Sequence, residues 1–527
     1  MTMMTLTAAP PAAHNNTKTV GRNFMFMGLE VVITLVVTLL TTVFIARLIG
    51  PTRLGYFNLI YWLTSITCSV GSLGIPLSTF KYLGEFLGSG KRELARAVFF
   101  YNLLAQTAIA STLAATALIA VLILVDPKYR LCSALLVLSI VPNMVTFVPS
   151  QANTAAESSI HNTRGAFVRA VIYVVAVTLS LLYGWDLVGI AAGLLLACSA
   201  ELIVKIVPVL RSMADVSHIP LPAEIRKRMF AFSGLSTGLM LLEIVVWDRS
   251  DIICLKLLHP DIRQVAFFSV CFSVVGKLVL PAQALANALS ATQMAEYSRN
   301  KANLFSMTSR AFVYVLMGTL PVLIGVACIA GPFVRVVYGS EYQPAIPVFT
   351  LIALFSIPKA TLTPGSTLLY SAEDLGFILK WGCIAGLANV VLDLLLIPHY
   401  GATGAALANG IAQTFAGATI CGRVLRRYPV RVDFSVLLRL GAATLAMAIV
   451  TLGVMAMPLS AVFKLIVGIP TGSLVFLIMS RVFVVLQTDD RRRLQMLSSL
   501  VPLPARHAYD WLVDFVVPTS PIDEVSG

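Results

Sequence analysis

Long apolar segments follow one another along almost the whole chain, and they constrain the fold more than any other feature. Stretches of about 17–25 mostly apolar residues alternate with polar breaks of at most roughly 20 residues. A helix of this length crosses the hydrocarbon core of a bilayer. We predict an all-α polytopic membrane protein with about fourteen transmembrane helices, at 24–47, 55–79, 97–124, 131–154, 164–184, 187–210, 231–256, 265–290, 305–331, 344–370, 377–397, 404–424, 436–457 and 461–486.

The composition agrees with a membrane protein and explains the positive charge. The 527 residues are 58% hydrophobic and 12% charged, whereas soluble domains carry about 25% charged residues. The net charge is +13, but Lys and Arg gather in the breaks that face the cytoplasm if the N-terminus lies inside. The positive charge therefore indicates which side of the membrane each break faces, and we predict no nucleic-acid partner. Both termini are predicted to be cytoplasmic.

A short sequence motif occurs twice, about 210 residues apart, and suggests an internal duplication. Each copy lies at the end of an apolar segment and contains a basic residue followed by a proline turn. A small residue and two aromatic residues then begin the next apolar segment. The matched positions are Arg47 with Lys256, Pro51 with Pro260, and Gly55-Tyr56-Phe57 with Ala266-Phe267-Phe268. An even number of spans in each half gives two parallel lobes.

This duplication predicts the division of the chain. We expect a disordered N-terminus, a six-helix N-lobe, a linker, a six-helix C-lobe, two extra helices and a cytoplasmic tail. The predicted bounds are 1–23, 24–210, 211–230, 231–426, 436–486 and 487–527, in that order. Within the tail, the segment His507–Val517 is predicted to be either a short interfacial helix anchored by Trp511 or disordered.

Nothing in the sequence indicates catalysis, a metal or a cofactor. The eight cysteines lie singly within apolar runs, and the histidines are scattered among loops and ends. Because the breaks are short, there is no room for a soluble catalytic domain. We predict a protein that is not an enzyme and carries no cofactor.

Three stretches resemble one transporter family. Residues 44–57 are similar to the first-loop signature of the polysaccharide-export branch of the multidrug/oligosaccharidyl-lipid/polysaccharide (MOP) exporter superfamily. Residues 389–408, with Asn389, Asp393 and a Gly-Ala-rich restart, resemble the junction between its eleventh and twelfth spans. Residues 248–257 resemble its charged seventh span. At Asp393 a neutral amide is more usual in that branch.

The resemblance implies a Wzx-type flippase with a V-shaped, MATE-like fold in the bacterial inner membrane. Such proteins move an undecaprenyl-diphosphate-linked oligosaccharide from the cytoplasmic to the periplasmic leaflet by alternating access. The implied partners are this lipid-linked substrate, membrane lipids, and the polymerase and export proteins of an exopolysaccharide, O-antigen or capsule pathway.

Cations inside spans are candidates for holding the diphosphate, because charge in a membrane interior is costly. Lys277 lies halfway through its span, and Lys359 lies in a span broken by prolines. Arg249 lies in the predicted seventh span. Arg47 and Lys256 lie near outward ends, where anchoring at lipid headgroups is an equally good interpretation.

Five acidic residues are candidates for carrying a coupling proton or cation: Glu30, Glu243, Asp248, Asp251 and Asp393. On an uninterrupted seventh span, Glu243 and Asp251 share one face with Asp248 beside them, and Arg249 and Lys256 lie on the opposite flank. In the alternative interpretation, these charges only form ion pairs between helices. Likewise, the amides of Asn409 and Gln413 either bind sugar hydroxyls or join helices.

Three other functions fit parts of the pattern. A multidrug/cation antiporter and a lipid II flippase share the superfamily and its architecture. A membrane glycan polymerase or ligase is the rival from another class, although it normally needs a sizeable periplasmic loop, and the breaks here are short.

Overall fold

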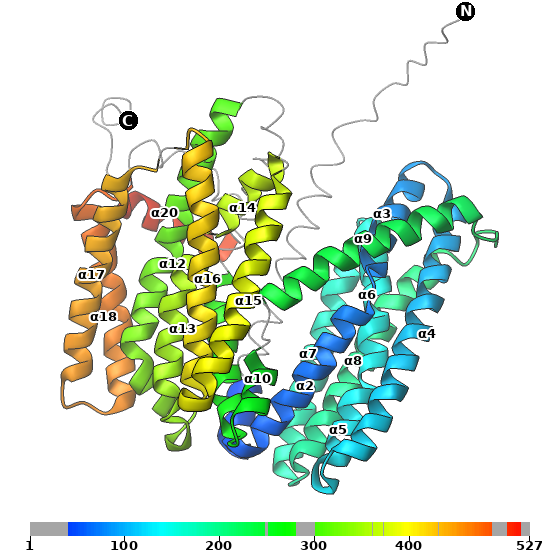
Figure 1. The fold of residues 1–527 in the computed structure, drawn as a ribbon, viewed down its shortest axis with the longest axis horizontal. Coiled ribbons are helices and arrows are strands. Elements are labelled where there is room, and N and C mark those ends of the chain that lie inside the picture. Colours follow the sequence, from blue (N-terminus) through cyan, green and yellow to red (C-terminus); the bar gives the residue numbers. More distant parts are fainter. Residues whose placement is uncertain are drawn as a thin grey trace, which may run out of the picture. The chain divides into compact units, whose positions relative to one another are not determined.

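The computed structural model describes residues 41–247, 251–280, 301–360, 362–372, 374–430, 432–486 and 503–517. Within these ranges every regular element is a helix, as the apolar segments predict. The chain divides into two compact units, unit 1 (Met1–Val245) and unit 2 (Val246–Gly527). Each unit is a bundle of long helices (Figure 1).

Unit 1 starts, in its described part, with a helix over residues 41–49. Long helices follow because apolar runs are interrupted only by short Gly-, Pro- or Ser-containing breaks. They are α2 (Pro51–Gly71), α3 (Ile75–Gly88), α4 (Arg92–Leu124), α5 (Pro127–Leu138), α6 (Ile140–Ala155), α7 (Ile160–Leu182), α8 (Asp186–Ser212) and α9 (Ala223–Trp247), whose last two residues belong to unit 2. The α7 and α8 helices pack against each other along their lengths.

The breaks of unit 1 gather at two ends of the bundle. At one end, Arg53 Nη1 lies 2.6 Å from Asp186 Oδ2 and joins the break before α2 to the start of α8. At the other end, Arg92 at the start of α4 donates to the Ser212 carbonyl at 3.1 Å. The breaks predicted to face outward thus lie together, and so do those predicted to face inward.

Unit 2 is built from a second set of helices. They are α10 (Asp251–Leu258), a helix over Arg263–Leu280, α12 (Lys301–Val337), the 3₁₀ turn η1 (Ser340–Tyr342), α13 (Ala345–Ala360), α14 (Leu362–Ser371), α15 (Leu375–Tyr400), α16 (Ala402–Arg427), α17 (Phe434–Ala456), α18 (Ala461–Val482) and α20 (Leu503–Val516).

Ten described helices are long and apolar enough to cross a membrane, or eleven if α2 and α3, which are bent by 43° at a short break, form one span. The predicted span 24–47 lies mostly outside the described residues. The predicted span 231–256 covers the greater part of α9, the undescribed residues 248–250 and all but the last two residues of α10. The α16 helix is not among the ten, because Gly, Thr, Asn and Gln lower its hydropathy. The total of fourteen stays a prediction, and so do the lobe boundaries.

The repeated motif has the same local structure in both copies. Arg47 is an exposed residue near the end of a helix, Gly50 turns the chain with φ 78°, and α2 begins at Pro51. In the second copy, Lys256 is exposed on α10, and the next helix begins at Arg263. Both copies are therefore helix–turn–helix corners that follow an exposed cation, as the duplication predicts.

The second corner joins the Gly-Ala-rich junction of α15 and α16. Gly401 has φ 54°, which glycine adopts without strain. The next backbone N–H, that of Ala402, donates to Gln264 Oε1 at 2.9 Å. A Cβ atom on Gly401 would lie 2.6 Å from the same oxygen. The second copy of the repeated motif thus meets the stretch that resembles the junction between the eleventh and twelfth spans at one hydrogen bond.

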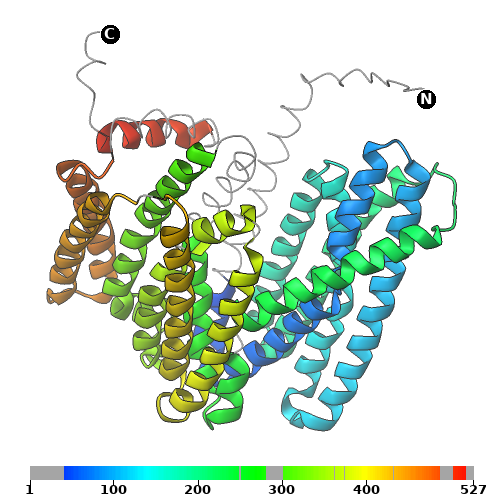
Figure 2. The same ribbon diagram turned by 45° about the horizontal axis from the view of Figure 1, so that its top comes forward.

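Small residues let α16 lie in the middle of unit 2. It packs against α10, α13, α14 and α15, and Figure 2 shows α15 and α16 running side by side. A Cβ on Gly404 would lie 2.4 Å from the Leu396 carbonyl oxygen, and one on Gly410 would lie 2.2 Å from the Phe355 ring. Close helix packing is therefore the structural role of these glycines.

The C-terminal helices extend unit 2 rather than its α16 core. The α17–α18 pair packs through Leu440, Met447 and Phe476 against apolar residues of α12. The α20 helix packs against α18 (Figure 2), and Arg481 donates to its Phe515 carbonyl at 3.0 Å. For the segment His507–Val517 the sequence predicted either a helix or disorder, and the structure has a helix there. Its Trp511 is exposed.

We predict that Gly410→Ala destabilises the protein by about 1–3 kcal/mol, because the added methyl group overpacks the α16–α13 contact. Gly422→Ala on the same helix is the matched control, since no atom outside its own helix segment lies within 4 Å of a Cβ there. The control should be neutral or stabilising by about 0.5–1 kcal/mol. Thermal unfolding of the two variants in detergent checks this, and equal melting temperatures would contradict it.

Candidate ion and substrate site

Four polar residues from three helices meet inside unit 2 and form what we call the Asp–Asn cluster: Asp251, Asn389, Asp393 and Asn409. Asp251 is the first residue of α10, and Asn409 lies about two turns into α16. Asn389 and Asp393 are four residues apart on α15, so they share one face of that helix. The close packing of α16 brings these three helices together.

Hydrogen bonds connect the members of the Asp–Asn cluster. Asn389 Nδ2 donates to Asp251 Oδ1 at 3.1 Å and to Asp393 Oδ2 at 3.4 Å. Asn409 Nδ2 donates to the other Asp251 oxygen at 3.0 Å. Both aspartates have no exposed surface, and the two asparagines are buried. Asp251 thus accepts hydrogen bonds from two buried amides, and Asp393 accepts one.

Two oxygen atoms of the cluster, Asn389 Oδ1 and Asp393 Oδ1, are buried without a hydrogen-bond partner among the described residues. Within the same residues, no lysine or arginine forms an ion pair with Asp251 or Asp393. Burying two ionised carboxylates without a counter-charge is costly. Carboxylate and amide oxygens are ligands for hard cations, and a proton on one carboxyl would also relieve the repulsion. The cluster is therefore chemically suited to a small cation or a proton.

A cavity of about 160 Å³ adjoins the cluster, because Asn409 lines it and also bonds Asp251. Lys359 and Gln413 line it as well, together with Ser356 and apolar residues. The Lys359 ammonium lies 5.4 Å from the centre of the Phe272 ring, within the range of a cation–π contact. The structure thus brings together one predicted cation, two predicted amides and two predicted carboxylates.

The other predicted residues are placed differently. Lys277 lies on the helix 263–280 with its ammonium nitrogen buried, but it does not line this cavity. Arg47 and Lys256 are exposed near helix ends, which agrees with the anchoring interpretation. Glu30, Asp248, Arg249 and the side chain of Glu243 lie outside the described residues, so the two predicted strips on the seventh span stay a prediction.

An ion-pair network in unit 1 was missed by the sequence analysis. Glu201 on α8 accepts from Arg169 on α7 at 2.9 Å and from Lys205, one turn further along α8, at 2.8 Å. All three residues lie within the predicted spans 164–184 and 187–210. The signal was present, because charges inside apolar spans, two of them four residues apart, indicate a paired or functional group.

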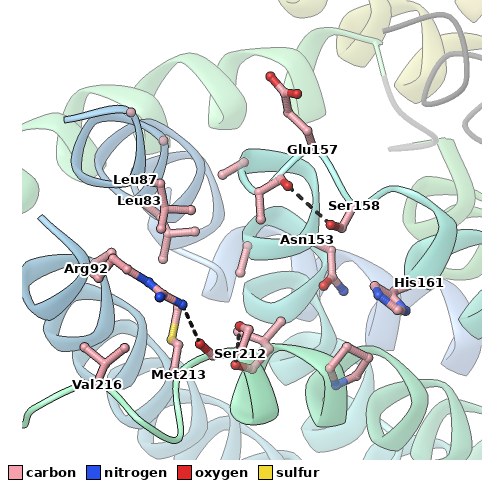
Figure 3. A pocket seen from close by; sticks show the side chains of 18 residues that line it. Leu83, Leu87, Arg92, Asn153, Glu157, Ser158, His161, Ser212, Met213 and Val216 are labelled. Atoms are coloured by element: carbon pink, nitrogen blue, oxygen red, sulfur yellow. Dashed lines mark hydrogen bonds between the residues drawn. The ribbon is translucent and has the colours of Figure 1, made fainter. Parts of the chain in front are cut away.

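Unit 1 also contains a cavity of about 510 Å³ at the end where α3, α4, α6 and α8 meet (Figure 3). Arg92 points across it and bonds the Ser212 carbonyl, as the dashed line in Figure 3 shows. Asn153 is also occupied, because it donates to Asn162 and to the Lys205 carbonyl. Two polar side chains that line this cavity are therefore engaged by other parts of unit 1.

Comparisons with known proteins agree with this architecture. Residues 29–347, more than half of the chain, match the family described as "Polysaccharide biosynthesis protein". No curated protein matches the chain in sequence.

Solved structures share the fold at low sequence identity. A lipid II flippase MurJ in an inward closed conformation has a TM-score of 0.69 and 16% identity, over 87% of this chain and 98% of that one. An inward-facing MATE-family multidrug resistance transporter has a TM-score of 0.61 and 14% identity, over 75% and 94%. A MOP-superfamily transporter from Pyrococcus furiosus has a TM-score of 0.56 and 15% identity, over 77% and 95%. The chain belongs to the polysaccharide biosynthesis protein family and has the fold of MOP-superfamily transporters.

Proposed function

We propose that the protein is a flippase for an undecaprenyl-diphosphate-linked oligosaccharide, working by alternating access in the bacterial inner membrane. The substrate moves from the cytoplasmic to the periplasmic leaflet and feeds exopolysaccharide, O-antigen or capsule synthesis. The observation that carries the proposal is the buried Asp–Asn cluster beside a cavity with Lys359, in a member of a polysaccharide biosynthesis family.

The Asp–Asn cluster is the proposed coupling site. Its two carboxyl groups are buried and linked through Asn389, so occupation by a cation or a proton changes the charge of the site by one. A change of charge in a membrane interior alters the free energy of the surrounding helices strongly. An ion gradient can therefore shift the balance between inward- and outward-open states. Glu30, Glu243 and Asp248 remain further candidates for the same task.

The cations provide the proposed contact with the diphosphate. Lys359 lines the cavity beside the cluster, and the amides of Asn409 and Gln413 lie on the same wall. An ammonium group attracts phosphate, and amides donate to and accept from sugar hydroxyls. Lys277 and Arg249 are proposed to act on the same charged group, whereas Arg47 and Lys256 serve at the lipid headgroups. The polymerase and export proteins of the pathway are the proposed partners.

Two related functions use the same fold, and a deletion strain separates them. Accumulation of lipid-linked oligosaccharide with retained viability supports the proposal. Lysis would instead favour lipid II as the substrate, which is the substrate named for the similar MurJ structure. Sensitivity to drugs alone would favour a multidrug antiporter. Glycan polymerisation by the purified protein would indicate the enzymatic alternative.

We predict that Asp251→Asn and Asp393→Asn each lower flipping at least about tenfold and that the double variant loses its dependence on the ion gradient. Asparagine keeps the shape of the aspartate side chain, so the substitution should disturb the protein fold little. It cannot bind a proton in this pH range or balance the charge of a cation, so the coupling should be lost. Flipping is measured in vesicles with imposed Na⁺ or proton gradients, and each gradient is dissipated separately. Asp261→Asn, on a loop aspartate paired with Arg263, is the control.

The coupling assignment is wrong if the double aspartate variant flips at the wild-type rate and still responds to the gradient. If neither gradient affects the wild-type protein, the transport is not ion-coupled.

We predict that Lys359→Gln lowers flipping about 10- to 100-fold, which corresponds to the loss of a charge-assisted hydrogen bond in a buried site. Lys277→Ala and Arg249→Ala should each reduce polymer export while the protein still inserts. Lys380→Gln, at an exposed position on α15, is the control and should leave export unchanged. Full export by the Lys277→Ala/Arg249→Ala double variant together with Lys359→Gln would contradict a cationic substrate site.

A further inference from the structure

One side of the first turns of α9 is docked on α3 of unit 1. Met229 is 3% exposed and belongs to an apolar cluster with Tyr82 and Phe86, and Ile225 and Phe232 pack against that cluster. The rings of Phe232 and Tyr82 meet edge to face, with their centroids 6.1 Å apart. Because the three α9 residues are spaced by three and four positions, they share one face of the helix.

Further contacts fix the same side of α9. Arg228 Nη2 lies 4.0 Å from Glu85 Oε2, and the Arg228 guanidinium lies 5.6 Å from the centre of the Tyr82 ring. The backbone of α9 also comes close to the start of α3, since a Cβ atom on Gly74 would lie 2.4 Å from the Ser233 carbonyl oxygen. The exposed ion pair is weak by itself. Together with the apolar cluster, these contacts determine which side of α9 faces away from unit 1.

The opposite side of α9 presents two cations around an aromatic ring. Phe230 is 82% exposed, and Arg226 and Lys227 are exposed as well. At 100° per residue, these three residues lie within about 100° of one another on the helix. Within the described residues, neither Arg226 nor Lys227 forms an ion pair. We call this surface the Arg–Lys–Phe face.

The predicted topology puts the Arg–Lys–Phe face at the level of the cytoplasmic headgroups. The linker 211–230 is predicted to be cytoplasmic, and the predicted seventh span begins at residue 231. Helices that lie against a membrane surface combine basic residues with aromatic side chains that enter the headgroup region. The cytoplasmic leaflet is negatively charged and attracts basic segments beside a span. Because the exposed ring adjoins an apolar span, lipid is favoured over a soluble protein as its neighbour.

We propose that the Arg–Lys–Phe face of α9 is a docking surface for the headgroups of anionic phospholipids in the cytoplasmic leaflet. Arg226 and Lys227 donate to the headgroup phosphate, and Phe230 enters the boundary between headgroups and acyl chains. The ligand is a membrane phospholipid and not the transported substrate, so this inference goes beyond the proposed function. Because the other side of α9 is docked on α3, the bound lipid also ties unit 1 to the leaflet.

The test places a reporter on the face and measures which lipid contacts it. The full-length Phe230→Trp variant is reconstituted into nanodiscs of phosphatidylcholine and phosphatidylglycerol, one of which carries bromine on its acyl chains. Bromine quenches tryptophan at short range, and the quenching measured in the wild-type protein is subtracted to remove the five native tryptophans. Varying the share of phosphatidylglycerol gives its affinity relative to phosphatidylcholine. We expect both lipids to quench the reporter and phosphatidylglycerol to be preferred at least about fivefold at low salt.

Two double variants of the reporter protein separate this face from general attraction by charge. Arg226→Gln/Lys227→Gln should bring the relative affinity to about one, because the cations that select the anionic lipid are gone. Lys128→Gln/Lys380→Gln removes the same two charges at exposed positions on α5 and α15, and it should keep the preference. About 0.5 M salt should lower the preference of the reporter protein, because it screens exposed charges. Melting temperatures in phosphatidylcholine show that the variants are folded.

The inference is overturned if neither brominated lipid quenches the reporter, which would leave the face in water and open to a soluble partner. It is also overturned if the two lipids quench equally at low salt, or if the two double variants show the same preference. The measurement involves no transport. Its outcome is therefore independent of whether the protein flips lipid-linked oligosaccharide.

Discussion

The cost of placing charge in a hydrocarbon interior is the constraint on which the rest of this structure depends. Two described carboxylates deep in spans are each held by hydrogen bonds or ion pairs. Amides of α15 and α16 hold Asp251, and Arg169 and Lys205 hold Glu201. In the Asp–Asn cluster, two acids lie together without an ion pair to a described cation.

Small residues make these groups possible. The α16 helix reaches α10 and α15 because glycine and alanine bring backbones close together, and Gly410 leaves room for Phe355. In unit 1, Gly165 makes room for the Lys205 stem in the same way. Each buried polar group therefore depends on a residue that has no polar chemistry of its own. A substitution that only adds a methyl group can displace a charge on the neighbouring helix.

The repeated motif has a structural rather than a chemical role. Both copies turn one helix into the next, and both cations on them are exposed. In unit 2, Gln264, which follows the turn of the second copy, accepts a hydrogen bond from the Ala402 N–H at the first residue of α16. This contact helps to fix where α16 begins. The two copies of this motif thus position helices, whereas the charges proposed to bind substrate or ions lie elsewhere on them.

The sequence by itself determined the helical membrane fold, because long apolar runs and short polar breaks depend only on local composition. Short motifs indicated the type of family. It also indicated Asp251, Asp393, Lys359, Asn409 and Gln413, since polar residues within spans are visible one at a time. Only the tertiary structure decided that these five adjoin one another, that Lys277 does not line their cavity, and that Arg169 shares Glu201 with Lys205. The physical reason is that partners on different helices are separated by up to 158 positions in the chain, and the close packing that joins them is set by residues with no charge.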